Sequence, residues 1–193
     1  LKQKGKNFYQ LQSKSADLKL TCEYAEQISS ESKTFAEVAD AAKVYWNRYW
    51  QKGAMVDFGQ CKDPRAQEME RRVVLSQYLL AIQDAGETPP QETGLTYNSW
   101  FGKFHLEMIL WHQAQFALWG HPELLERSLS WYFKAEPNAR KIARRQGFKG
   151  VRWMKMTDPD AGEAPSSVGS FLIWQQPHLI YLAELLYRAD PSP

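Results

Sequence analysis

Polar and apolar residues alternate in two places near the start of the chain. Residues Phe8 to Gln12 and Leu18 to Tyr24 carry aromatic or branched side chains at every second position, which is the period of a half-buried β-strand. We therefore expect two short strands within residues 1–30. Because a pair of strands is only marginally stable alone, these strands should belong to a larger β-sheet.

The apolar spacing changes to that of an α-helix after residue 33. Thr34 and Glu37 have the capping-box pattern that begins many helices. Apolar side chains then recur on one helical face, at Val38, Ala41, Ala42, Tyr45, Trp46, Tyr49 and Trp50. This pattern predicts a helix that ends near Gly53.

Five more helices follow from the same spacing and from Pro and Gly signals at their ends. Their expected ranges are Asp63–Pro64 to Gly86, Gly102 to Gly120, His121–Pro122 to about residue 136, Pro137 to Gly147, and Phe171 to Arg188 with a kink at Pro177. Short turns and long loops alternate between these helices. We therefore predict a mainly α protein made of antiparallel helical hairpins, with its long loops at one end.

Composition narrows the classes of partner. The net charge is +2, from 24 Lys and Arg against 22 Asp and Glu, and no run of basic residues is present, so nucleic acid is not an expected partner. No segment has the apolar length of a membrane span, and no signal peptide is visible. Because the chain begins at Leu1, we expect it to be processed or part of a longer polypeptide. Cys22 and Cys61 could form a disulfide or remain as free buried thiols.

Candidate chemistry lies where a long loop leads into the helix predicted from Gly102. Here His, Lys and Glu side chains stand among Trp and Phe, and buried Lys and Glu are rare unless they are paired or functional. His105 and His112 are seven residues apart, which is too wide for a helical zinc pair, so we expect no metal. The chain also has no Gly-x-Ser-x-Gly elbow and no phosphate-binding loop, and no cofactor is expected. Aromatic rings with hydrogen-bonding groups between them suit a sugar, whose C–H faces lie on rings while its hydroxyls need donors and acceptors.

The same segments resemble the six-hairpin glycosidases, in particular families 65 and 95 of the glycoside hydrolases. Lys103 to Glu107 (KFHLE) stands where family 65 has Phe-Trp-Asp-x-Glu. The Pro89–Pro90 loop, Gly94–Leu95, Met108 and Trp111 are similar to a run in family 95. Further similarity lies in the aromatic helix with Tyr45, Trp46 and Trp50, in the loop from Gly147 to Trp153, and in the segment from Trp174 to His178 (WQQPH).

This resemblance implies a domain organisation. Residues 1–30 would be the last strands of an N-terminal β-sandwich, residues 31–53 a linker helix, and residues 54–193 part of an (α/α)6-barrel catalytic domain. The remainder of the same polypeptide would complete the barrel. The resemblance also implies a periplasmic or extracellular location.

The resemblance further implies a carbohydrate substrate and a set of residues that bind it. These residues are Trp100, Lys103, His105, Glu107, Trp111, His112, Trp153, Lys155, Gln175, Gln176 and His178. Glu107 and His105 are the candidates for a catalytic role, although Glu107 could instead orient Lys103 or His105. His105 replaces an Asp or Asn of the two families. Their general-acid Glu would lie beyond this chain, so the chain alone should be inactive.

Several alternatives remain open at this point. Family 65 includes phosphorylases, so phosphorolysis is possible as well as hydrolysis. The chain could instead be a non-catalytic helical protein that binds carbohydrate or acts as a scaffold. A helical regulator that binds protein partners would expose large apolar patches. The sequence does not determine the sugar, the anomer or the stereochemical course.

Overall fold

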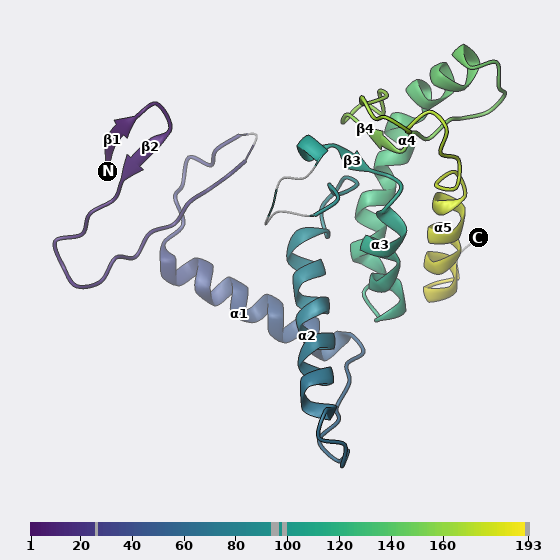
Figure 1. Cartoon of the computed structure of the whole chain (residues 1–193). Helices are drawn as coiled ribbons and strands as arrows, with labels where there is room; N and C mark the ends of the chain where they lie inside the picture. Colours follow the sequence, from purple (N-terminus) through teal and green to yellow (C-terminus); the bar gives the residue numbers. More distant parts are fainter. Residues whose placement is uncertain (26, 94–96, 98–99, 192–193) are drawn as a thin grey trace. The chain divides into compact units, whose positions relative to one another are not determined.

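The structure is a computed structural model that describes residues 1–25, 27–93, 97 and 100–191. Within these residues the chain is mainly helical, with five α-helices and two small two-stranded sheets (Figure 1). The mainly α class is thus confirmed. The chain divides into two compact units, Leu1–Gln51 and Lys52–Pro193.

The first unit begins with a β-hairpin. Strands β1 (Lys2–Gly5) and β2 (Phe8–Gln10) pair antiparallel, with Lys2 opposite Gln10. The prediction of a strand at Leu18 to Tyr24 was wrong, because this segment has no regular structure and Tyr24 is 93% exposed. A strand needs a hydrogen-bonded neighbour, and β2 finds one in β1 across a tight turn. Alternation alone gives residues 18–24 no such neighbour.

Helix α1 (Phe35–Lys52), which lies in the first unit up to Gln51, confirms the predicted helix. Its capping box forms as expected: the Glu37 carboxylate accepts a hydrogen bond from the Thr34 backbone N–H at 2.7 Å, and Thr34 Oγ1 accepts one from the Glu37 N–H at 3.3 Å. The hydrogen bonds that the Thr34 backbone N–H and hydroxyl donate to the Glu37 carboxylate lower the pKa of Glu37. Rings along the helix also contact one another, since Trp46 and Trp50 stack with centroids 6.3 Å apart.

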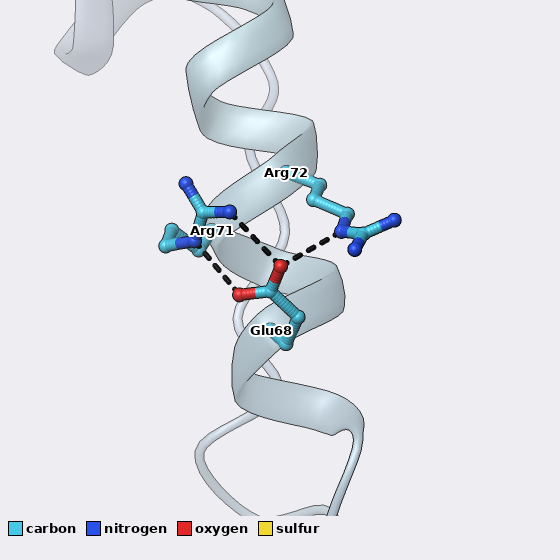
Figure 2. Close-up of polar contacts among 3 residues, drawn as sticks. All are labelled: Glu68, Arg71 and Arg72. Atoms are coloured by element: carbon cyan, nitrogen blue, oxygen red, sulfur yellow. Dashed lines mark hydrogen bonds and ion pairs between the residues drawn. The ribbon is translucent and has the colours of Figure 1, made fainter.

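Helix α2 (Ala66–Gln83) lies in the second unit and begins two residues later than predicted. Asp63 is not the N-cap; its carboxylate instead accepts a hydrogen bond from the Arg65 backbone N–H at 2.8 Å. On the exposed side of the first turns, Glu68 accepts hydrogen bonds from Arg71 and Arg72 at 2.8–2.9 Å (Figure 2). These two guanidinium groups lower the pKa of Glu68 to about 2.

The core of the second unit lies between α3 (Ile109–Leu118), α4 (Pro122–Arg145) and α5 (His178–Ala189), which pack against one another (Figure 1). Its most buried apolar side chains are Leu106, Ile109, Phe116, Leu125, Met154, Met156 and Leu182. Helices α3 and α4 form a hairpin through Gly120, whose φ of +87° places it in the left-handed region. This confirms a predicted pair of helices with a short turn.

Gly53 packs directly on the ring of His121, at the turn between α3 and α4. An ideal Cβ on Gly53 would lie 2.1 Å from His121 Nε2, and the His121 side chain is 2% exposed. The backbone N–H of Ala54 donates to the carbonyl of Trp119 at 2.8 Å. The chain therefore passes close to the hairpin turn at a position where only glycine fits.

Two predictions at prolines were wrong, a helix boundary at Pro137 and a kink at Pro177. Helix α4 continues through Pro137 as one helix. Pro137 removes one N–H from the helix, and the residue one turn earlier, Phe133, is 76% exposed, so the turn that loses this hydrogen bond lies at the protein surface. At the other end of the chain, Pro177 caps α5 instead of kinking it. Proline disfavours helical geometry in the residue before it, and Gln176 is bonded to the backbone of Trp153.

The helix predicted from Gly102 begins only at Ile109. Residues Trp100–Gly102 form a 3₁₀ turn, and strand β3 (Phe104–His105) pairs antiparallel with β4 (Met156–Thr157). The partner of β3 comes from a distant part of the chain, which a local periodicity cannot reveal. His105 therefore lies in β3 and His112 in α3, and not both in one helix as the predicted range Gly102 to Gly120 implied.

None of the helices in the described residues combines the length and apolar composition that a bilayer-spanning helix requires. Cys22 and Cys61 are both free and exposed, so neither the disulfide nor the buried thiols considered above are present.

Candidate functional site

The pairing of β3 with β4 brings together side chains that are far apart in the sequence. Phe104 lies opposite Thr157, and His105 lies opposite Met156. One step beyond this pair, the Glu107 backbone N–H donates to the Lys155 carbonyl at 3.2 Å. We use the name β3–β4 cluster for the polar and aromatic side chains gathered here: Trp100, Lys103, His105, Glu107 and Lys155.

Lys155 is the centre of the β3–β4 cluster. Its Nζ lies 3.5 Å from Glu107 Oε2 and 5.2 Å from the centroid of the Trp100 ring. The two charged side chains are 11% and 18% exposed, whereas Trp100 is 45% exposed. An ammonium over an indole face is stabilised by the ring quadrupole. A largely buried ion pair therefore lies beneath an aromatic ring that remains open to solvent.

The backbone that carries Trp100 is strained. Trp100, Phe101 and Gly102 have φ values of 51°, 61° and 69°. The left-handed region costs a residue other than glycine about 1–2 kcal/mol, and such residues concentrate at binding and catalytic sites. Lys103 holds the end of this turn through a hydrogen bond from Nζ to the Pro165 carbonyl, and its Nζ lies 5.6 Å from the Phe101 ring.

His105 is a buried imidazole without a hydrogen bond in the described structure. The residue is 2% exposed, neither ring nitrogen has a hydrogen-bonding partner, and Nδ1 lies 3.7 Å from Glu92 Oε2. Burial, with the positive charge of Lys155 as the next cause, lowers the pKa of His105 to about 4. The ring is therefore neutral near pH 7, and its contact with Glu92 is not an ion pair.

A second aromatic group lies at the adjoining ends of α3 and α5. Trp111 and Trp174 meet edge to face at 5.2 Å, and the His178 ring lies 6.0 Å from the first and 5.2 Å from the second. We call these three residues the tryptophan face. Trp111 is 54% exposed and Trp174 is 40% exposed, so the indole rings of this group are partly open to solvent.

His178 connects the tryptophan face to the β3–β4 cluster. Its Nδ1 is 3.2 Å from the carbonyl of Leu106, which makes Nδ1 the protonated nitrogen of the neutral ring. Burial lowers the pKa of His178, while the bond to Leu106 and the nearby charge of Glu107 oppose this effect. The two groups of residues thus interact electrostatically and form one candidate site.

The other predicted site residues make mainly structural contacts. Trp153 is buried against Tyr132, with ring centroids 4.8 Å apart. The side-chain amides of Gln175 and Gln176 both donate to the Trp153 carbonyl. His112 donates from Nε2 to the Glu92 carbonyl at 3.0 Å, and burial lowers its pKa. These four side chains hold loops in place around the β3–β4 cluster.

Sequence reasoning missed Glu92 and Trp174 as site residues. Glu92 follows the Pro89–Pro90 pair and contacts both His105 and His112, but no spacing rule links a loop carboxylate to these rings. Trp174 belongs to a segment singled out above, but its 40% exposure is a property of the fold that its neighbours in the chain do not reveal. Residues Gly94, Leu95 and Thr96 lie outside the described residues.

Within the part of the chain that the structure describes, no group of three or more His, Cys, Asp or Glu side chains could hold a metal ion. The chemistry that the site offers is that of aromatic faces, one Lys–Glu pair and neutral imidazoles. No protein-family model, curated protein or solved structure matches this chain, so the likeness to six-hairpin glycosidases stays a prediction from the residues quoted above.

Proposed function

We propose that this chain forms the sugar-binding part of a glycoside hydrolase. The observation that carries this proposal is the Lys155–Glu107 pair beneath the exposed ring of Trp100. A sugar unit presents apolar C–H groups on its faces and hydroxyls around its edge. An indole next to an ammonium and a carboxylate matches both kinds of surface at once.

The tryptophan face extends this surface for a longer ligand. Trp111 and Trp174 expose indole rings, and His178 lies between them and Glu107. We propose that the β3–β4 cluster binds one sugar unit and that the tryptophan face contacts the next. A chain of two or more units would then bind more tightly than a monosaccharide.

A neutral His105 suits this function. One nitrogen of a neutral imidazole donates a hydrogen bond and the other accepts one, so the ring can bind a hydroxyl in either direction. The two glycosidase families have Asp or Asn at the similar position. We propose that His105 keeps the hydrogen-bonding role of these residues without their charge.

Hydrolysis of a glycosidic bond normally needs two carboxyl groups, one as general acid and one as base or nucleophile. Glu107 is paired with Lys155, which suits a carboxylate that accepts hydroxyl hydrogen bonds. We therefore assign Glu107 to binding and propose that the general-acid Glu lies elsewhere in the polypeptide. In this proposal the helical hairpins belong to an incomplete (α/α)6 barrel.

The test is a screen of the full-length protein against α-linked gluco-, fuco-, galacto- and rhamno-oligosaccharides. On the best substrate we expect Trp100→Ala and Glu107→Gln each to lower kcat/KM by about a hundredfold, as the loss of about 3 kcal/mol of transition-state binding would. Matched controls are Phe133→Ala and Glu126→Gln, which change exposed side chains on α4. Wild-type turnover in both site variants would contradict the proposed site.

A non-catalytic carbohydrate-binding protein is the alternative that the same rings could serve. It predicts binding of the oligosaccharides to wild type, loss of binding in Trp100→Ala, and no release of reducing ends by the full-length protein. Calorimetric titration alongside a reducing-end assay separates the two functions.

A further inference from the structure

A second pocket lies between the end of α2 and the start of β3, apart from the aromatic rings of the proposed sugar site. It has a volume of about 560 Å³, and its lining includes Ile82, Asp84, Pro89, Pro90, Gly102 and Phe104. Most of these residues offer apolar surface. Among the described residues that line the pocket, Asp84 is the one with an ionisable side chain.

Among the described residues, the carboxyl group of Asp84 has no ion-pair or hydrogen-bonding partner that accounts for its burial. The residue is 4% exposed, and its Oδ1 makes no hydrogen bond to any described residue. Buried carboxylates are ordinarily paired with a cation or hydrogen-bonded. The backbone of Asp84, in contrast, is hydrogen-bonded. Its N–H donates to the Leu80 carbonyl, and its carbonyl accepts from Gln113 Nε2 at 3.0 Å.

The position of Asp84 at the end of α2 also disfavours a negative charge on its carboxyl group. Asp84 is the C-cap of α2, and no basic residue lies in the last turn of that helix. The C-terminus of a helix carries partial negative charge, which favours cations and disfavours a carboxylate. Residues 81–83 of the same turn also line the pocket. The carboxyl group and the end of the helix therefore favour the same kind of ligand, a positively charged one.

The other residues that line the pocket favour an organic cation over a metal ion. A hard metal ion takes several oxygen ligands in a small shell, whereas this pocket is large and has Pro89, Pro90 and the Phe104 ring in its walls. An aromatic ring also attracts organic ammonium groups. We propose that this pocket binds a ligand that carries a protonated amine, with Asp84 as its counter-ion and Phe104 against its apolar part.

This inference does not depend on the proposed sugar site, although Gly102 and Phe104 border both. If both proposals hold, an amine-bearing ligand such as an amino sugar could bind next to the β3–β4 cluster. Failure of one would leave the other intact, because glycosidase activity and amine binding have separate readouts.

The experiment titrates wild-type protein with two cations, benzylamine and glucosamine, and with their uncharged counterparts, benzyl alcohol and glucose. Binding is followed by amide chemical shifts in ¹H–¹⁵N spectra. We expect the cations to shift the amides of Ala85, Gly86 and Thr88, which line this pocket, and the uncharged compounds to leave these three amides unchanged. Equal shifts of these amides with charged and uncharged compounds, or shifts confined to other residues, would overturn the proposal. Equal shifts with sodium or potassium chloride would also overturn it, in favour of an inorganic cation site.

Asp84→Asn tests the role of the carboxyl group. Loss of a buried charge partner should weaken binding of the cations by about thirtyfold or more. Glu87→Gln is the matched control, because Glu87 is an exposed carboxylate in the same loop, and it should bind the cations as wild type does. Unchanged cation binding in Asp84→Asn would exclude Asp84 as the counter-ion.

A pH series on wild type gives a second test that needs no variant. Burial raises the pKa of Asp84 to about 7, so the affinity for benzylamine should rise between about pH 5 and pH 8 as the carboxyl group loses its proton. The other titratable groups on the surrounding elements are Glu87 and Glu92 of the loop, His105 of β3 and His112 of α3. His105→Asn should keep the rise of benzylamine affinity with pH, and Asp84→Asn should remove it. The two variants therefore identify the titrating group. An affinity independent of pH would contradict the proposal.

Discussion

The Nζ of Lys155 lies 3.5 Å from Oε2 of Glu107 in a largely buried ion pair. Removing one of the two charges leaves the other unpaired and largely buried. Glu107→Gln should therefore lower the free energy of unfolding by about 3 kcal/mol, the lower end for a broken buried pair. The double variant Glu107→Gln/Lys155→Met should recover part of this loss, because neither charge then remains.

Chemical denaturation of the four proteins in this double-mutant cycle gives the coupling energy directly. The control is Glu184→Gln, which breaks the exposed pair with Arg188 on α5 and should cost less than about 1 kcal/mol. If Glu107→Gln were no more costly than Glu184→Gln, the Lys155–Glu107 pair would not be held as the structure describes.

Gly53→Ala should destabilise the second unit. The added Cβ would meet Nε2 of His121 at 2.1 Å, and the buried ring can yield only by moving its neighbours. Overpacking of this kind costs about 1–3 kcal/mol, which a thermal melt would detect. Gly86→Ala is the matched control, since its Cβ would meet nothing within 4 Å. Equal melting temperatures for the two variants would contradict the close approach of Gly53 to His121.

Two buried groups should give opposite pH dependence of stability in the same window. Burial raises the pKa of Asp84 from 3.8 to about 7, so from about pH 4 to pH 7 the folded chain holds a proton that the unfolded chain has lost. The contribution of Asp84 to the free energy of unfolding therefore falls as pH rises, by about 4 kcal/mol. Burial lowers the pKa of His105 from 6.5 to about 4. Between these values the unfolded chain holds the extra proton, so stability falls as pH drops, by about 3 kcal/mol.

Single variants should separate these two effects. Asp84→Asn should leave a protein that loses stability towards acid, and His105→Asn should leave one that loses stability towards neutral pH. Denaturant titrations at pH 4, 5, 6 and 7, spanning the two windows, provide the measurement. Glu68→Gln is a control, because the two arginines lower the pKa of Glu68 to about 2 and its effect should change only below about pH 4.5. Identical pH profiles for the Asp84 and His105 variants would refute this account.

Phe101→Asn should stabilise the turn that carries Trp100. Phe101 has a φ of 61° and is 86% exposed, so little packing is lost, and Asn tolerates the left-handed region better than Phe does. We expect a gain of about 0.5–1 kcal/mol in the free energy of unfolding. Phe101→Ala removes the same ring, but alanine does not tolerate the left-handed region as asparagine does. This variant should therefore give no gain in the free energy of unfolding. A gain of equal size in both variants would show that the exposed ring, and not the backbone, carries the cost.

Local features of the fold were predictable from sequence. The capping box of Thr34 and Glu37, the helix that follows it, and the glycine turn between α3 and α4 all depend on residues within a few positions of one another. The start of the helix predicted from Gly102 was wrong because a local signal met a distant partner. Residues 102–108 have an apolar pattern that suits a helix, yet Phe104 and His105 pair with β4.

The residues of the candidate site were likewise only partly predictable from sequence. Several predicted residues do gather, among them Trp100, Glu107 and Lys155. The sequence pattern could not tell Lys155, which contacts Glu107, from Gln175, which is bonded to backbone. That distinction depends on how two loops fold against each other. Asp84 was missed altogether, because its burial follows from the packing around the end of α2 and not from its neighbours in the chain.

The short pairing of β3 with β4 has a consequence for the order of folding. It joins His105 to Met156 across all of α3 and α4, and closing so long a loop is entropically slow compared with forming helices. The α3–α4 hairpin should therefore form first, with the Lys155–Glu107 contact among the last to be made. In a pulse-labelling hydrogen-exchange experiment, the amides of α3 and α4 should become protected before that of Glu107, which donates to the Lys155 carbonyl.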